Sequence, residues 1–341
     1  MLEELLKADA VRVVSSVDWS ALDGAHILVS GASGLIGSHL VATICEFHRG
    51  GLDVALSAVV HRPPAAHLTQ LLAQCDASVI THELRGHGAV DCRRPVDLAI
   101  FAAGSAQPSV FTSDPIGTIA INTSGLLAVA ACVRPGGTLL YLSSSEIYSG
   151  LPAMAAKESD IGRTTPTHPR AAYIEGKRCG EALCSALARQ ELSTRIARVS
   201  SAYGPGVALG DTRVMSQFID SALSTGSIRL RDSGQASRKY CYVTDVEELL
   251  WDVALRGEQP LYNVGGQSST TIRELAELVG RLTNASVEVP ATDDPLAGAP
   301  SAVGMDLSRV TTEFGKSQYI SLEEGLRRTI AWHGALHDAA D

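Results

Sequence analysis

Short apolar runs alternate with helical patterns along the first half of the chain. The apolar runs are AHILVSG, DVALSAVV, DLAIFAAG and TLLYLSS. They are nearly continuous in hydrophobic residues, which is typical of strands buried on both faces of a sheet. Helices are expected between them at about 34–47, 65–74 and 115–133. This alternation predicts an α/β fold built on a doubly wound parallel sheet.

The pattern changes in the second half of the chain. A long helix is expected from about Arg170 to Gln190, and the strand TRIARVSS follows it. Beyond Tyr203, glycine-rich loops, a helix near 211–224 and short strands predict a smaller C-terminal α/β lobe. The stretch 284–305 is expected to be a long loop. The segment SLEEGLRRTIAWH then predicts a final helix with a serine cap and an acidic first turn.

Composition narrows the class of protein. The chain has 341 residues and a formal net charge of −9. That charge argues against a nucleic-acid binder or a protein of anionic membranes, because both need a basic surface. The N-terminal segment MLEELLKADAVRVV predicts a short amphipathic helix rather than a signal peptide or an anchor, so a cytoplasmic location is expected. Seven scattered cysteines without a CxxC spacing favour reduced thiols over a disulfide framework or a metal site.

A glycine-rich turn follows the first strand. In HILVSGASGLIGSHL, Gly31, Gly34 and Gly37 stand between a strand and a helix. Such glycines allow a tight turn and a close approach of the backbone to a pyrophosphate, which the free N–H groups of the helix start can bind. This context predicts a Rossmann-type dinucleotide site, whose contacts are expected from Gly31, Ser33, Gly34, Leu35, Ile36 and Gly37.

The end of the second strand should decide between NAD and NADP. An acid there would bind the ribose 2′-hydroxyl, but this chain has His61 and Arg62. Arg62 could pair with a 2′-phosphate or could be an ordinary surface arginine. NAD is expected, and NADP remains an alternative.

Tyr173 and Lys177 lie four residues apart in YIEGK, on one face of the expected helix. A lysine ammonium close to a tyrosine favours the phenolate and should lower the tyrosine pKa toward neutral. Tyr173 could then act as a general base toward a sugar hydroxyl. With the glycine turn and SSSEIYS at a strand end, this pair predicts a catalytic centre.

Along residues 25–335 the chain resembles the extended short-chain dehydrogenases/reductases of the NAD-dependent epimerase/dehydratase family. Within that family it is most similar to the UDP-glucuronate decarboxylases, also called UDP-xylose synthases. The similar segments are DPIGTIAINTSG, SSSEIY, PRAAYIEGKRCGE, RIARVSSAYGPG, TRVMSQFI, RKYCYVTDV and SLEEGLRRTI.

The resemblance implies roles for individual residues. Ser144 would hydrogen-bond the reacting sugar oxygen beside Tyr173, and Ser145 and Glu146 match the Ser-Glu pair of the decarboxylases. The 4,6-dehydratases have an Asp-Glu pair there, and Ser145 cannot readily supply that acid. Cofactor contacts would extend to Ala102, Ala103, Gly104, Asn122, Tyr173 and Lys177. Substrate contacts would come from Ser105, Glu146, Arg170, Ser201, Arg213 and Arg238, and no metal is implied.

Three positions depart from the family pattern. Ser201 stands where an asparagine usually precedes the aromatic-Gly-Pro turn, and Asp294-Pro295 runs into Leu296-Ala297-Gly298-Ala299 instead of basic residues. His61-Arg62 replaces the usual acid after the second strand. The catalytic core therefore follows the family more closely than the substrate pocket does.

The resemblance implies an enzyme that oxidises C4 of a nucleotide-sugar, most simply a UDP-sugar, and then returns the hydride. A UDP-glucuronate-like substrate would lose CO2 as a β-keto acid. Epimerisation is the alternative, followed by net reduction of a keto sugar and by a non-catalytic NAD(P) sensor. The expected layout is an N-terminal extension at 1–24, a dinucleotide-binding domain at 25–200 and a mainly substrate-binding lobe at 201–335. Some strands of that lobe are expected to return to the main sheet, and the helices at 115–133 and 170–190 are expected to form a homodimer contact.

Overall fold

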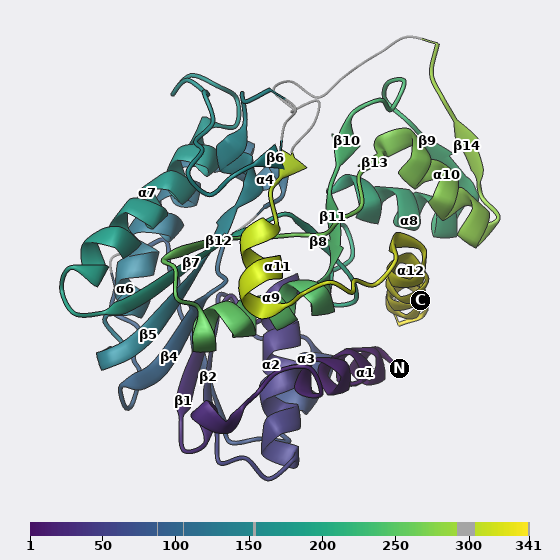
Figure 1. Ribbon diagram of the computed structural model, residues 1–341. Helices are drawn as coiled ribbons and strands as arrows, with labels where there is room; N and C mark the ends of the chain where they lie inside the picture. The colour runs from purple at the N-terminus through teal and green to yellow at the C-terminus, as the bar shows by residue number, and fades with distance from the viewer. Residues whose placement is uncertain (87, 105, 153–154, 292–303, 340–341) are drawn as a thin grey trace.

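The structure is a computed structural model that describes residues 1–86, 88–104, 106–152, 155–291 and 304–339. Its centre is a seven-stranded sheet in the order β12-β7-β5-β4-β1-β2-β3 (Figure 1). Every neighbouring pair in this sheet is parallel. The strands are β1 (His26–Ser30), β2 (Ala55–Val60), β3 (Ala77–Thr81), β4 (Val96–Phe101), β5 (Val133–Ser144), β7 (Ser193–Val199) and β12 (Leu261–Val264). The predicted α/β class with a doubly wound, Rossmann-type sheet is therefore confirmed.

Successive strand residues enter two separate hydrophobic cores, one on each face of the sheet. Ile27 and Val29 pack into the first core, whereas Leu28 between them packs into the second. This alternation follows from the two-residue period of a strand, and it explains why both sets of positions are apolar. The first core is covered by α1 (Leu2–Val14), α2 (Leu35–Arg49), α3 (Ala66–Leu72) and α9 (Val243–Arg256), and the second by α6 (Leu126–Ala130) and α7 (Ala171–Ala188).

The helix expected at 115–133 is shorter and is interrupted. It consists of α5 (Pro115–Ala120), the π-helical turn η2 (Ile121–Gly125) and α6, and it ends at Ala130. Asn122 lies in the turn, where its side-chain Nδ2 donates to the Thr118 carbonyl at 2.9 Å. A π-turn widens the backbone ring by one residue and often marks a functional position in a helix.

The smaller lobe lies at the upper right of Figure 1 and has its own core around Phe218, Leu275 and Val279. Its helices are α8 (Val214–Thr225) and α10 (Ile272–Thr283), the latter with a capping box between Thr271 and Glu274. Its short strands are β8 (Ser201–Tyr203), β9 (Ser227–Arg229), β10 (Ser237–Arg238), β11 (Tyr240–Tyr242), β13 (Thr270–Thr271) and β14 (Ser286–Glu288).

Short elements complete the chain. The expected loop at 284–305 contains β14 and β15, and its residues 292–303 lie outside the described part. The remaining elements are η1 (Ser20–Leu22), α4 (Pro108–Ser113), η3 (Ser145–Tyr148), β6 (Ala155–Ala156), β15 (Gly304–Met305), α11 (Ser308–Phe314) and α12 (Leu322–Asp338).

The first and last helices contact each other (Figure 1). Asp9 of α1 is 1% exposed, accepts a hydrogen bond from the Tyr242 hydroxyl at 2.7 Å and pairs with Arg328 of α12 at 2.8 Å. These three residues join α1, β11 and α12. A buried carboxylate held in this way is costly to leave unpaired, so the contact fixes how the helices dock.

The sequence predicts that the cysteines are reduced thiols, but two of them are paired in the structure. Cys45 of α2 and Cys75, which follows α3, form a disulfide because α2 and α3 pack against each other. The scattered sequence positions gave no sign of this proximity. Five other cysteines are free thiols: Cys92, Cys132, Cys179, Cys184 and Cys241.

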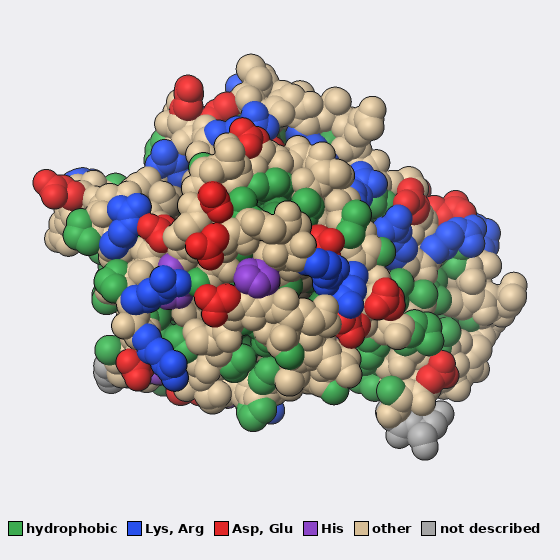
Figure 2. Space-filling model, turned by 90° about the horizontal axis from the view of Figure 1, so that it is seen from below, with side chains coloured by type: hydrophobic (Ala, Val, Ile, Leu, Met, Phe, Trp, Pro, Cys, Tyr) green, Lys and Arg blue, Asp and Glu red, His purple; other side chains and the backbone are tan. Residues whose placement is uncertain are grey.

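The outer surface carries both signs of charge. On the face seen in Figure 2, Lys and Arg side chains are mixed with Asp and Glu. Among the described residues, none of the helices combines the length and hydrophobicity needed to cross a membrane.

Candidate active site

The glycine turn joins β1 to α2 in the way that the sequence predicts. Gly31 has φ +71°, and a Cβ on Gly31 would lie 2.8 Å from the Ala102 carbonyl oxygen. A Cβ on Gly37 would lie 2.1 Å from the Gly31 oxygen. Both positions therefore require glycine. This turn brings the start of α2, from Gly34 through Leu35, Ile36 and Gly37, against the end of β1.

This turn fits a dinucleotide pyrophosphate. Gly34 is the N-cap of α2 and offers no side-chain cap, so the first-turn N–H groups are available for an anion. Ser33 lies within the same turn. The turn could thus hold the cofactor with its backbone, with the partial positive charge of a 15-residue helix behind it.

The end of β2 carries His61 and Arg62, both exposed. His61 Nδ1 lies 3.0 Å from Glu83 Oε2, which comes from the residues after β3. A carboxylate is therefore present beside β2, although it comes from the segment that follows the neighbouring strand β3.

The loop after β4 approaches the catalytic helix. Ala102 donates its N–H to Ser30 at 3.2 Å, and Ala103 is buried. Gly104 has φ +136°, and a Cβ there would lie 3.8 Å from Lys177 Nζ. The loop thus links the glycine turn to α7. Ser105, the expected substrate contact, lies outside the described residues.

Tyr173 lies on α7 beside the end of β5 and is 5% exposed. Its hydroxyl makes a side-chain hydrogen bond with Ser144, which lowers its pKa. Burial outweighs that bond and raises the pKa of Tyr173 to about 12. The predicted lowering of the Tyr173 pKa toward neutral is therefore wrong. The Phe111 ring, which the sequence does not single out, stacks on Tyr173 with a centroid distance of 5.1 Å.

Lys177 is one turn further along the same face of α7 and is 5% exposed. Its ammonium donates to the Leu142 carbonyl at 2.7 Å. Burial lowers the pKa of Lys177 to about 8, while Glu181 acts in the opposite direction. The expected face is therefore formed, and Ser144, Tyr173 and Lys177 meet where β5 ends.

Glu146 pairs with Arg170 rather than standing alone. Arg170 donates to the two carboxylate oxygens at 2.6 and 2.9 Å. The Arg170 guanidinium also lies over the Phe111 ring, 4.9 Å from its centroid. Ser145 is buried in η3 between Ser144 and Glu146. The predicted substrate residue Arg170 and the predicted catalytic residue Glu146 thus form one ion pair beside Tyr173.

The other predicted substrate residues come from the smaller lobe. Arg213 binds the Asp211 carboxylate through two nitrogens, and its charge lowers the pKa of Tyr173. Arg238 is in the electrostatic range of Glu146 and Arg170, and burial lowers its pKa. Ser201 is the register partner of Tyr240, two residues after Arg238. Arg213 and Arg238 therefore reach the region of Tyr173 and Glu146 from the start of α8 and from β10, whereas Ser201 lies in β8.

Several residues around the site were not anticipated. Phe111 and Asp211 have no sequence signal that distinguishes them. Glu181 could have been found, because it continues the four-residue spacing of Tyr173 and Lys177. It pairs with the buried Arg198 at 2.8 Å.

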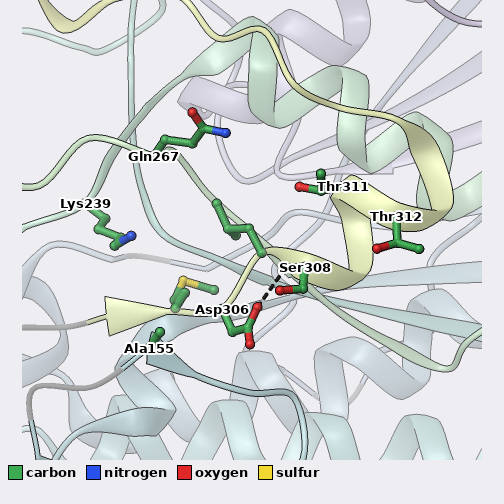
Figure 3. Close-up of a pocket in the computed structure, with 9 residues that line it drawn as sticks. Ala155, Lys239, Gln267, Asp306, Ser308, Thr311 and Thr312 are labelled. Carbon is green, nitrogen blue, oxygen red and sulfur yellow. Dashed lines mark hydrogen bonds between the residues drawn. The ribbon is translucent and has the colours of Figure 1, made fainter.

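A separate hollow of about 520 Å³ lies beside the smaller lobe (Figure 3). Lys239, the neighbour of Arg238, lines it together with Gln267 and Asp306. The Asp306 carboxylate accepts the Ser308 N–H at 2.8 Å, as the dashed line in Figure 3 marks. Tyr173 is not among its lining residues.

Known proteins resemble this chain in sequence. The model of the NAD dependent epimerase/dehydratase family matches residues 27–265. The chain is 30% identical to UDP-glucuronic acid decarboxylase 3 of Arabidopsis thaliana, over 88% of this chain and 86% of the relative. It is 29% identical to UDP-glucuronic acid decarboxylase 1 of Xenopus tropicalis, over 91% of this chain and 72% of the relative.

The fold also matches solved structures. MoeE5 in complex with UDP-glucose and NAD superimposes with a TM-score of 0.75 at 25% identity, covering 91% of this chain and 99% of MoeE5. The family match covers the glycine turn, the residues around Tyr173 and the last strand of the main sheet. The chain therefore belongs to the NAD dependent epimerase/dehydratase family.

Proposed function

We propose that the protein is an NAD-dependent nucleotide-sugar decarboxylase that acts on UDP-glucuronate or a close analogue. The observation that carries this proposal is the joint placement of Ser144, Tyr173 and the Glu146–Arg170 pair at the end of β5. The decarboxylases of A. thaliana and X. tropicalis, which resemble this chain over most of its length, support the choice of reaction.

The residues present divide the work as follows. Bound NAD would supply reversible hydride transfer at C4 of the sugar. The glycine turn and the loop at Ala102–Gly104 would hold it, because they lie together beside Lys177. Tyr173 would take the proton of the C4 hydroxyl once the positive charge that bound NAD⁺ adds to the site lowers its pKa from about 12, and the hydrogen bond from Ser144 orients the Tyr173 hydroxyl. The resulting 4-ketone makes the sugar carboxylate a β-keto acid. Its loss of CO2 leaves an enolate, which takes up a proton from solvent at C5 before the hydride returns to C4 and the Tyr173 proton returns to the C4 oxygen.

Three arginines surround this centre and suit an anionic substrate. Guanidinium groups bind carboxylates and phosphates through paired hydrogen bonds. Arg170 and Arg213 already hold carboxylates of the protein, Glu146 and Asp211, in this way. A substrate carboxylate or diphosphate would compete with Glu146 and Asp211 for the guanidinium groups of Arg170 and Arg213. Arg238 would provide a third guanidinium group for it.

Mass spectrometry of the product tests the proposal. The purified protein is incubated with UDP-glucuronate, first alone and then with NAD. A product lighter by the mass of CO2 is expected, and the Tyr173→Phe variant is the matched control. An isomer of unchanged mass would replace decarboxylation with epimerisation. An unconverted sugar under both conditions would exclude this substrate.

We also propose that two copies of the chain associate through α5, α6 and α7. Ile116 is 81% exposed, and Ile119 and Leu127 on the same segment are 42% and 44% exposed. Large apolar side chains gathered on one exposed segment favour a protein contact over solvent. A twofold axis would bring the same segment of the second copy onto them.

A further inference from the structure

Behind the catalytic residues, a second tyrosine lies in contact with Lys177. Tyr141 is in β5, is fully buried and belongs to the core under α7. Lys177 Nζ lies 5.0 Å from the centroid of the Tyr141 ring. The ammonium therefore has the Leu142 carbonyl on one side and an aromatic face on another.

The hydroxyl of Tyr141 has a partner of its own. It donates to Asn122 Oδ1 at 2.8 Å, and the other end of that amide donates to the Thr118 carbonyl at 2.9 Å. Asn122 is 1% exposed and lies in the π-turn η2. Tyr141 thus contacts both the helix that carries the catalytic pair and the bulge that faces it.

The neighbouring sequence accommodates this tyrosine. A Cβ at position 180 of α7 would lie 2.2 Å from the Tyr141 hydroxyl oxygen, so Gly180 leaves the space that the hydroxyl occupies. Phe101 of β4 packs beside the Tyr141 ring with a centroid distance of 5.7 Å. The ring is therefore held between a neighbouring strand and α7 and has little freedom to turn.

We propose that Tyr141 is a positioning residue of this site: its ring face holds the Lys177 ammonium, and its hydroxyl fixes Asn122 in the π-turn. An aromatic face attracts a cation most strongly where water is excluded, and Lys177 is buried there. The role in turnover rests on the proposed function, whereas the contact with Lys177 does not.

Other groups also act on Lys177. Glu181 and Cys184 approach it from its own helix, and Glu181 is held by Arg198 of β7. Tyr141 is the aromatic contact that β5 provides. Glu181 is itself bonded to Arg198 through both oxygens and to Ser143, so its charge is already shared with these two groups. The ring is therefore expected to help keep the ammonium charged.

NMR titration of the lysine side chains tests directly whether the Tyr141 ring acts on the Lys177 ammonium, and it needs no substrate. The chain has five lysines, so a sample with labelled lysine Cε gives few signals, and Lys177→Arg assigns the one of interest. Tyr141→Leu removes the ring and should lower the Lys177 pKa by about 0.5–1.5 pH units. Tyr141→Phe keeps the ring and should leave the pKa unchanged.

Phe101→Leu is the matched control, because it removes a neighbouring ring from the same core without touching Lys177. Phe101→Leu should destabilise the protein but leave the Lys177 pKa unchanged. If Tyr141→Leu does not fold, Tyr141→Met provides a second aliphatic variant closer in length. An unchanged Lys177 pKa in a folded aliphatic variant, or an equal shift in Phe101→Leu, would overturn the assignment of the ring.

Kinetics test the hydroxyl. Tyr141→Phe should lower kcat about two- to tenfold, the range expected for one lost buried hydrogen bond, with KM for the sugar little changed. A wild-type kcat would overturn the role of the Asn122 contact. If no sugar is turned over by the wild-type protein, the proposed function fails. The lysine titration still tests whether the Tyr141 ring acts on Lys177.

Discussion

Tyr173 is hydrogen-bonded to Ser144 through its hydroxyl, and its ring stacks on Phe111. Replacing it by phenylalanine removes one oxygen and keeps the stacked ring. A general base contributes about 10²- to 10⁴-fold, so turnover of the sugar should fall by that range. NAD binding, followed by fluorescence, should persist.

The matched control for this variant is Tyr319→Phe. Within the described residues, the buried Tyr319 hydroxyl has no hydrogen-bond partner, so removing it should leave kcat unaltered. A Tyr173→Phe enzyme that retains near wild-type turnover would assign the base to another group. It would also revive the view of the chain as a cofactor sensor.

Glu247 gives a pH dependence to stability. It is fully buried on α9, where it accepts a hydrogen bond from Trp251 at 3.2 Å, and burial raises its pKa to about 8. The folded pKa lies above the unfolded value, so below about pH 4.5 this carboxyl does not lower the free energy of unfolding. Between about pH 4.5 and 8 the unfolded chain ionises first, and stability falls by up to about 1.4 kcal/mol per pH unit.

Glu247→Gln should flatten that fall. Urea unfolding at pH 5 and pH 8 would measure it, since the variant is expected to lose less stability between the two than the wild type. The exposed Glu323→Gln on α12 is the control and should follow the wild-type slope. Equal slopes in all three proteins would show that Glu247 does not stay protonated in the fold.

At the scale of elements, two helical glycines should respond oppositely to alanine. The methyl group of Gly180→Ala would meet the Tyr141 hydroxyl oxygen at 2.2 Å, and overpacking should cost about 1–3 kcal/mol. Gly334 of α12 has nothing within 4 Å of a built Cβ, so Gly334→Ala should gain about 0.5–1 kcal/mol from helix propensity. Thermal unfolding of both variants checks the pair. Equal shifts would mean that α7 has room beside Tyr141.

The elements that the sequence predicted well are those whose own pattern is decisive. Strands buried on both faces need continuous apolar runs, and the turn at Gly31 needs a residue that tolerates positive φ. The break in the helix at 115–133 was not predicted. It coincides with a contact between Asn122 and Tyr141, which are 19 residues apart.

The candidate site shows the same contrast between features that follow from the pattern of one element and contacts that form only in the folded chain. The face shared by Tyr173 and Lys177 comes from helical spacing alone. The pairing of Glu146 with Arg170, and of Asp211 with Arg213, depends on which side chains the folded chain brings together. The sequence therefore predicts polar residues for the site, but not that carboxylates of the protein hold Arg170 and Arg213.

At the scale of the whole molecule, the exposed Ile116 predicts the behaviour of the assembly. Ile116→Lys would place a charge in the proposed contact of α5, α6 and α7, and burying it unpaired is costly. Sedimentation should then show dimers for the wild type and monomers for the variant. Val79→Lys, on the edge strand β3 and 46% exposed, should leave the dimer intact. A wild-type monomer would contradict the proposal.

The pair of Asp9 and Arg328 also sets an order of events during synthesis. The two residues are 319 positions apart, so a ribosome adding about 5–20 residues per second separates their emergence by roughly 15–60 s. For that interval α1 can settle on α2 but cannot close its contact with α12. The nascent chain therefore keeps part of α1 open to chaperones until the residues of α12 have been synthesised.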